Sequence, residues 1–221
     1  MNNNNMLPPL EFGDKKINHY VQNITSNVHH FYLYGMIDDD ISMYSELLNV
    51  LKTANENDTV VIYINSEGGV LRMALQIANA MLSTQARVVT SLDGEACSAA
   101  TIIFLAGHEY IVNPNCTFMI HFYSGGAWGK GHELEARVNA MGAHTSKLMK
   151  AFYDKILSEQ ELADVVSGRD IYMDSEELLT RLEAAAEASL PEEVLEGPVG
   201  EESVPKKSTK PKKKKVAKKK G

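Results

Sequence analysis

The order of apolar and polar positions predicts strands that alternate with helices along most of the chain. Short apolar or alternating runs rich in β-branched and aromatic residues are typical of strands, and they occupy residues 28–35, 59–65, 88–92, 110–112 and 117–121. Helical patterns occupy residues 41–51, 70–82, 98–106, 132–157, 159–166 and 176–188. Strands separated by helices imply parallel crossovers, so we expect an α/β fold.

Composition divides the chain into three regions. Residues 1–25 open with an asparagine run and show no sustained period, so we expect a flexible N-terminal segment. Residues 26–190 carry the strand and helix patterns and form the expected domain, which is long enough to bury a sizeable core. Residues 191–221 are rich in Pro, Gly, Glu, Ser and Lys, so we expect a disordered, lysine-rich tail.

Charge differs between the body and the tail. From Glu201 onward there are ten lysines and two glutamates, which leaves 12 basic and 27 acidic residues and a formal charge of −15 in the first 200. The tail has no interleaved aromatic residues. A solvated extension or docking to an acidic partner is therefore favoured over nucleic-acid recognition.

Cysteine usage, histidine spacing and hydropathy exclude several classes of protein. Cys97 and Cys116 lie among apolar or small residues, which indicates buried, reduced thiols in a cytosolic protein. No run resembles a signal peptide or approaches the roughly 18 apolar residues of a membrane span, so we expect a soluble, cytoplasmic protein. Five histidines lack the spacing of a metal site: His29, His30, His108, His132 and His144. We expect no metal and no organic cofactor.

Three segments that could carry chemistry lie at the ends of predicted strands. Residues 65–69 read Asn-Ser-Glu-Gly-Gly, Ser98 follows a strand and opens a helix, and His121 ends the run 117–121. Open α/β sheets place their ligands at strand ends, so these segments can meet. A serine becomes a nucleophile when an imidazole takes its proton and a carboxylate orients that imidazole. The pattern therefore predicts a serine hydrolase.

Spacing alone does not decide which residues fill every role in this site. Asp164, Asp170 and Asp174 could each supply the orienting carboxylate. A glycine pair is also an ordinary turn, a serine among small residues also packs helices, and a histidine after apolar residues is also a core group. The sequence has no GxSxG nucleophile elbow, which argues against an ordinary α/β-hydrolase.

Four blocks occur in a fixed order along the chain. They read Ile-Asn-Ser-Glu-Gly-Gly at 64–69, Gly-Glu-Ala-Cys-Ser at 94–98, Met-Ile-His at 119–121 with Gly125-Gly126, and Arg169-Asp170. Their order and spacing resemble the ClpP family, the proteolytic subunit of the Clp protease, over residues 28–179. The resemblance implies a repeated β-β-α spiral shared with the crotonase superfamily, with a protruding strand-helix handle.

The resemblance also implies roles for individual residues. Ser98 would be the nucleophile of a serine endopeptidase, His121 its base and Asp170 the orienting carboxylate. The backbone N–H groups of Gly69 and Ala99 would form the oxyanion hole.

The resemblance further implies an assembly. Gly125 and Gly126 fall where the family carries its handle, which borders bound substrate and interlocks two stacked heptameric rings of identical subunits. The active sites would then face a closed chamber reached only by unfolded polypeptides. An AAA+ unfoldase of the ClpX or ClpA type would be the ATP-using partner, near axial loops within residues 1–25. The alternative for the handle region is a flexible loop followed by an amphipathic helix.

Several positions depart from the family pattern. The family usually has proline, alanine and methionine where Glu67, Cys97 and Ala99 stand, and commonly has Gln-Pro in place of Phe122-Tyr123. Its closing Tyr-Gly-Leu-Ile-Asp segment is missing. Three alternatives therefore stay open: a non-catalytic ring or assembly subunit, a dedicated processing protease such as one for virus head maturation in a host cytoplasm, and a crotonase-type acyl-CoA enzyme.

Overall fold

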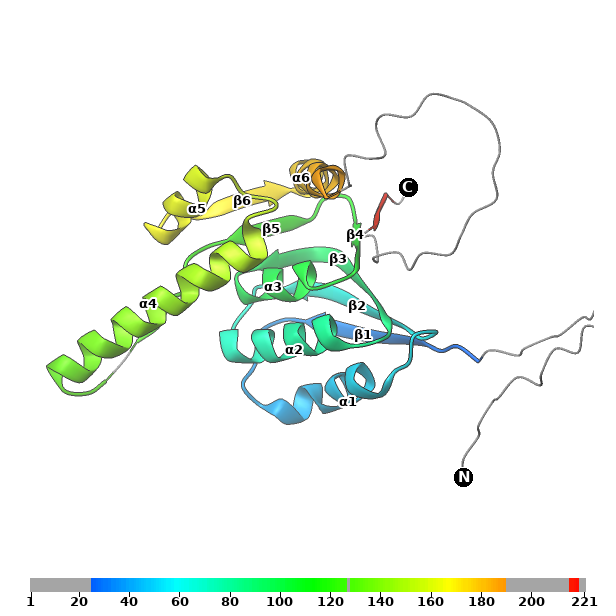
Figure 1. Ribbon diagram of the computed structural model, residues 1–221, viewed down its shortest axis with the longest axis horizontal. Coiled ribbons are helices and arrows are strands. Elements are labelled where there is room, and N and C mark those ends of the chain that lie inside the picture. Colours follow the sequence, from blue (N-terminus) through cyan, green and yellow to red (C-terminus); the bar gives the residue numbers. More distant parts are fainter. Residues whose placement is uncertain (1–24, 127, 190–214, 219–221) are drawn as a thin grey trace, which may run out of the picture.

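The computed structural model describes residues 25–126, 128–189 and 215–218, and within them the chain forms one mixed sheet with helices packed beside it (Figure 1). The strands are β1 (Val28–Tyr34), β2 (Thr59–Ser66), β3 (Arg87–Cys97), β4 (Glu109–Val112), β5 (Thr117–Ile120), β6 (Ile171–Asp174) and β7 (Lys215–Lys218). The helices are the 3-10 helix η1 (Ile41–Tyr44) and α1 (Ser45–Thr53), α2 (Leu71–Ser83), α3 (Ala99–Leu105), α4 (Gly131–Tyr153), α5 (Glu159–Val166) and α6 (Ser175–Ala188). The expected α/β fold is confirmed.

Strand β3 organises the sheet because it is long enough to pair with three neighbours. It runs parallel to β2 along one edge, while its other edge pairs first with β4 and then with β5. The sequence predicts a strand only to Leu92, since the following Asp-Gly-Glu interrupts the apolar pattern. The structure continues the strand to Cys97, and this extension carries the chain directly to Ser98.

Strand β6 makes the sheet mixed. It pairs antiparallel with β5, with Ile120 opposite Ile171 and Thr117 opposite Asp174. Its alternation covers only four residues, of which Ile171 and Met173 are buried, and this is too short a pattern to predict a strand. The expectation of parallel crossovers is therefore wrong at this edge of the sheet.

Helices α1, α2 and α3 stack beside strands β1 to β3 (Figure 1). Helix α2 shows why they pack there: its buried residues recur three or four positions apart and meet the buried side chains of β2 in one core. The buried residues of the two elements are Met73, Ala74, Ile77, Ala78, Ala80 and Met81 on α2 and Val60, Ile62, Ile64 and Ser66 on β2.

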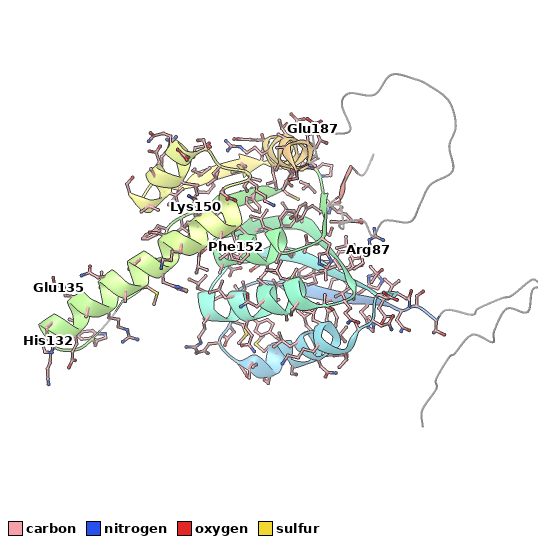
Figure 2. The ribbon with its side chains drawn as sticks, in the orientation of Figure 1. Arg87, His132, Glu135, Lys150, Phe152 and Glu187 are labelled. Atoms are coloured by element: carbon pink, nitrogen blue, oxygen red, sulfur yellow. The ribbon has the colours of Figure 1, made fainter. Side chains whose placement is uncertain are left out.

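Helix α4 extends away from the rest of the fold. Figure 2 shows His132 and Glu135 toward its far end and Lys150 and Phe152 where it meets the body. Its buried residues, Thr145, Met149 and Tyr153, all lie in its second half. The helix ends at Tyr153 rather than at residue 157. The expected handle consists of a strand and a helix. Residues 121–126 and 128–130, which lead into α4, form no strand, so α4 is the only element of the handle in this described part of the chain.

Much of the two expected terminal regions lies outside the described residues. Of residues 1–25 only the last is described, and the expected axial loops lie outside the described residues. In the expected tail, residues 215–218 form β7, which pairs parallel with β4, with Glu109 opposite Lys215. The boundaries at residues 25 and 190 remain predictions. Within the described part of the chain, every helix is too short or too polar to cross a membrane.

Candidate active site

The strand ends that the sequence singles out meet at one edge of the sheet. Ser66 at the end of β2 lies opposite Ala96 of β3, and Ala96 lies opposite Phe118 of β5. The segments that follow these strands are therefore neighbours. They carry Gly69, Ser98 and His121, which line one common pocket.

Ser98 stands in the turn between β3 and α3 with a strained backbone. Its φ of 55° and ψ of −125° lie outside the regions that L-residues normally occupy, and such strain costs about 1–3 kcal/mol. Its N–H donates to the Met119 carbonyl at 2.8 Å, and its carbonyl accepts from the Thr101 N–H at 3.0 Å and the Thr101 hydroxyl at 2.5 Å. These three hydrogen bonds hold the turn in place.

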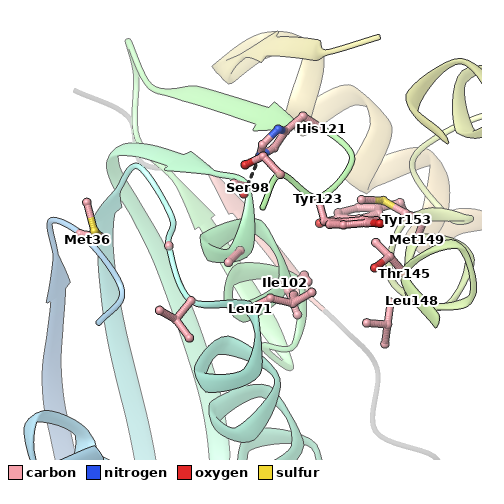
Figure 3. A pocket seen from close by; sticks show the side chains of 14 residues that line it. Met36, Leu71, Ser98, Ile102, His121, Tyr123, Thr145, Leu148, Met149 and Tyr153 are labelled. Carbon is pink, nitrogen blue, oxygen red and sulfur yellow. Dashed lines mark hydrogen bonds between the residues drawn. The ribbon is translucent and has the colours of Figure 1, made fainter. Parts of the chain in front are cut away.

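The Ser98 hydroxyl and the His121 ring are in direct hydrogen-bond contact. Ser98 Oγ and His121 Nε2 are 2.6 Å apart, and both residues are half-buried (Figure 3). In the tautomer that carries its proton on Nδ1, Nε2 accepts the hydrogen bond from Oγ. This is the geometry in which an imidazole can remove a serine proton.

The Gly68-Gly69 turn packs directly against the backbone around Ser98. Both glycines have positive φ, 95° and 143°, which side chains rarely allow. A Cβ on Gly68 would lie 2.4 Å from the Cys97 carbonyl oxygen and 3.1 Å from the Ala99 nitrogen. Two separate backbone segments can approach this closely only because position 68 has no side chain.

This close approach brings two candidate oxyanion donors to the same pocket. Ile37 bonds the carbonyl of Gly68 and the N–H of Val70, so the Gly69 N–H lies between these bonds and takes part in neither. Ala99 is the first residue of α3, where N–H groups have no partner within the helix. The N–H groups of Gly69 and Ala99 are thus the candidate oxyanion donors of this pocket.

Asp170 lies beside His121 without being bonded to it. Because Ile120 at the end of β5 pairs with Ile171 at the start of β6, His121 and Asp170 are the residues directly beyond the last pair of this antiparallel ladder. Asp170 is exposed, and among the described residues no hydrogen bond joins its carboxylate to His121. The structure therefore brings Ser98 and His121 into contact and leaves Asp170 nearby.

The two rival carboxylates are engaged elsewhere. Asp164 accepts from Gln160 and from Arg169, both at 2.8 Å, and these bonds lower the pKa of its carboxyl. Asp174 caps α6 by accepting from the N–H groups of Glu176 and Glu177, and it lies opposite Thr117 at the far end of β5 from His121. Of the three candidates, Asp170 has the position next to His121.

Cys97, the residue before Ser98, does not compete with it as a nucleophile. Burial, with a contribution from the neighbouring Glu95 carboxylate, raises the pKa of the Cys97 thiol to about 11. The thiol therefore stays protonated and unreactive at neutral pH. Burial also raises the pKa of Cys116, and both residues are buried, free cysteines as expected.

A pocket of about 440 Å³ opens beside Ser98 and His121 (Figure 3). Part of its wall comes from α4, through Thr145, Leu148, Met149 and Tyr153. The sequence analysis did not single out these residues. Thr145, Met149 and Tyr153 are spaced four apart, which places them on one face of α4. This spacing is the sequence signal that could have identified them as neighbours.

The two glycines singled out by the resemblance lie outside this pocket. Gly125 and Gly126 are exposed in the connection to α4, with open space where a Cβ would stand, and neither lines the pocket. In the described part of the chain, no three His, Cys, Asp or Glu side chains lie close enough together to hold a metal ion.

Comparison with known protein families gives a match over most of the chain. A family model described as Clp protease matches residues 14–181. The match covers well over half of the chain and includes Gly69, Ser98, Ala99, His121 and Asp170.

Proposed function

The chain belongs to the Clp protease family, and from that premise we propose that it is a serine endopeptidase acting on unfolded polypeptides. The observation that carries the proposal is the 2.6 Å contact between Ser98 Oγ and His121 Nε2. The backbone N–H groups of Gly69 and Ala99, which line the same pocket as Ser98, support the proposal. Peptide hydrolysis needs hydrogen-bond donors for the oxyanion that forms.

In the proposed reaction, His121 Nε2 takes the proton of Ser98 as Oγ attacks the carbonyl carbon of a peptide bond. The carbonyl oxygen becomes an oxyanion and accepts hydrogen bonds from the N–H groups of Gly69 and Ala99. The intermediate collapses, the C–N bond breaks, and protonated His121 gives its proton to the leaving amine. Water, deprotonated by His121, then hydrolyses the acyl-enzyme and restores Ser98.

Asp170 is the proposed orienting carboxylate. Its place directly before β6, next to the end of β5 that His121 follows, supports this role, and a rotation of its exposed side chain toward Nδ1 would complete the triad. Asp164 and Asp174 are less suited, because an ion pair and a helix cap already use their carboxylates.

Assembly is the second part of the proposal. Members of this family form oligomers that work with AAA+ partners. We propose that this chain forms two stacked heptameric rings through α4 and the region of Gly125 and Gly126, with the active sites inside. An ATP-driven unfoldase of the ClpX or ClpA type would feed the chamber, and the chain itself would need no cofactor.

A non-catalytic ring subunit is the alternative with a specific observation behind it. Asp170 and His121 are not hydrogen-bonded in the described structure, and Glu67, Cys97 and Ala99 depart from the family pattern. Such a subunit would keep the fold and the assembly while lacking an activated serine.

Labelling with a fluorophosphonate probe separates these two functions. We expect one adduct, located on Ser98 by intact mass and peptide mapping. Ser98→Ala should abolish it, and His121→Ala should slow it at least about 10³-fold, because the hydroxyl then has no base. Asp170→Asn should slow it by about 10²–10⁴-fold.

Two matched variants test whether any serine or histidine substitution lowers the labelling rate. Ser167→Ala removes an exposed serine at the end of α5, His144→Ala removes an exposed histidine on α4, and both should label at the wild-type rate. Absence of any adduct in assembled wild-type protein would refute the endopeptidase and favour the non-catalytic subunit.

A further inference from the structure

The pocket beside Ser98 has a mixed chemical character on its α4 wall. Leu148 and Met149 make part of this wall apolar, whereas Thr145 and Tyr153 bring two hydroxyl groups to it (Figure 3). Thr145 and Tyr153 are both buried, with 2% of their surface exposed. The hydrogen bonds of these two hydroxyls decide what kind of side chain the pocket favours.

The Tyr153 hydroxyl already uses its proton inside the fold. The Thr101 hydroxyl donates to the Ser98 carbonyl at 2.5 Å and lies 2.6 Å from the Tyr153 hydroxyl. Each hydroxyl has one proton, so Tyr153 must be the donor in the second bond. This relay connects α4 to the Ser98 turn and leaves Tyr153 with no proton for a ligand.

Thr145, in contrast, has no partner for its hydroxyl. Among the described residues, its Oγ1 is the one buried side-chain nitrogen or oxygen without a hydrogen bond. Other helical Ser and Thr residues of this chain donate to the carbonyl four positions earlier, as Ser146 does to Gly142 and Thr180 to Glu176. The Thr145 hydroxyl makes no such bond, although it lies on the wall of a pocket large enough for a side chain.

An unpaired buried hydroxyl discriminates between occupants of the pocket. The fold pairs this hydroxyl with no described residue, and a wholly apolar side chain in the pocket would leave it unpaired. A side chain with a hydrogen-bonding atom at its tip would supply the missing bond. Sites built in this way reject analogues that lack the polar atom.

We propose that this pocket receives the side chain preceding the scissile bond and selects one with an apolar stem and a hydrogen-bonding tip, such as tyrosine or glutamine. Thr145 is the residue that determines the selection. The site residues Gly69, Ser98, Ala99 and His121 line the same pocket, so the side chain next to the attacked carbonyl enters it. This inference rests on the proposed endopeptidase function.

Peptides that differ only at this position test the selection. Two nearly isosteric pairs, tyrosine against phenylalanine and glutamine against methionine, isolate the polar tip. For wild type we expect kcat/KM to be about three- to tenfold higher for the polar member of at least one pair, the value of one neutral hydrogen bond. Thr145→Val, which keeps the shape, should remove the preference, and Thr145→Ser, which keeps the hydroxyl, should retain it.

A binding measurement keeps the inference testable if the protein does not cleave peptides. Product peptides that end in tyrosine or phenylalanine, and in glutamine or methionine, are titrated into Ser98→Ala by fluorescence anisotropy. We expect the same three- to tenfold preference in Kd, lost in Ser98→Ala/Thr145→Val. Equal Kd values within both pairs would overturn the selection even if Ser98 labels normally. Failure to label Ser98, with the preference intact, would overturn only the endopeptidase.

Thermal unfolding provides an independent control on the hydroxyl. Because the Thr145 hydroxyl is unpaired, its loss removes no hydrogen bond, and the Thr145→Val variant should unfold at the wild-type temperature or above it. A clear fall in that temperature would mean that the fold itself pairs the hydroxyl, which would contradict the proposal.

Discussion

At the scale of single residues, the candidate site depends on backbone segments that approach each other without side chains between them. Gly68 is the clearest case, since a Cβ there would overlap the Cys97 carbonyl oxygen at 2.4 Å. Its φ of 95° adds a second reason why only glycine fits. The position of the Gly69 N–H relative to Ser98 therefore follows from the identity of residue 68.

Gly68→Ala tests this dependence. We expect the Gly68-Gly69 turn to shift away from Ser98, to lower stability by about 1–3 kcal/mol and to slow Ser98 labelling at least about tenfold. Thermal unfolding and fluorophosphonate kinetics measure the two effects. Gly142→Ala is the matched control, because its Cβ would meet open space on a helix and should raise stability by about 0.5–1 kcal/mol. Wild-type labelling by Gly68→Ala would contradict the proposed oxyanion donor.

At the scale of elements, one arginine joins α5 and α6. Arg181 on α6 pairs with Glu161 on α5 at 2.7 Å, pairs with Glu177 at 2.7 Å, and donates to the Ile156 carbonyl. The Arg181 hydrogen bond lowers the pKa of Glu161 from 4.5 to about 2. The ionised carboxylate is thus favoured in the folded protein.

This pKa shift makes the stability of the α5–α6 contact depend on pH. A carboxyl whose pKa is lower when folded stabilises fully above its unfolded pKa, here 4.5, and loses that effect as pH falls toward 2. The pair is partly exposed, so we expect Glu161→Gln to cost only about 1 kcal/mol at pH 7. Thermal unfolding from pH 7 down to pH 3 should show the difference from wild type shrinking below pH 4.5.

The exposed pair of Arg72 and Asp39 provides the comparison for that experiment. Its side chains are 72% and 61% exposed, so Asp39→Asn should change the unfolding temperature little at any of these pH values. A Glu161→Gln difference that stays constant between pH 7 and pH 3 would show that lost packing, not lost charge, causes the effect.

At the scale of the whole molecule, α4 leaves apolar surface unburied. Val138 is 53% exposed and Met141 is 41% exposed on the half of the helix that has no buried residue, and Trp128 before it is 97% exposed. A helix extending from the body with such side chains is suited to contact another subunit. The described single chain contains nothing that covers this surface.

Val138→Glu/Met141→Glu tests the proposed role of α4 in assembly. Two charges on this surface should prevent its burial between subunits, so we expect light scattering after size-exclusion chromatography to give a lower mass than wild type. Leu82→Glu, which changes a similarly exposed residue on α2, should leave the mass unchanged. An unchanged mass in the double variant would exclude α4 as the principal contact.

Much of this fold could be predicted from the sequence where local signals agree. Residues 159–166 form α5 with the predicted bounds, because the Ser158 cap, the Glu161 that reciprocates it and the apolar spacing all indicate the same start. Strand β6 could not be predicted, because its four residues are ordered by pairing with β5, a contact distant in sequence. The extension of β3 beyond Leu92 has the same origin.

Part of the candidate site could also be predicted from the sequence. The ordered blocks single out Ser98, His121 and Asp170 as candidates. Ser98 and His121 follow or end predicted strands, whereas only its place in the family pattern favours Asp170 over Asp164 and Asp174. The contact between Thr101 and Tyr153 joins residues 52 apart through side chains alone, and no local pattern encodes it. The unpaired state of Thr145 likewise depends on what surrounds it in space.

The positive φ of Ser98 has a consequence for any attempt to engineer this protein. Glycine adopts a φ of 55° with a ψ of −125° readily, as it does in the first central position of a type II′ turn. Ser98→Gly therefore relieves backbone strain and deletes the proposed nucleophile in one substitution. A screen that rewards thermal tolerance alone would enrich inactive protein at this position, so selection for robustness must be coupled to an activity readout.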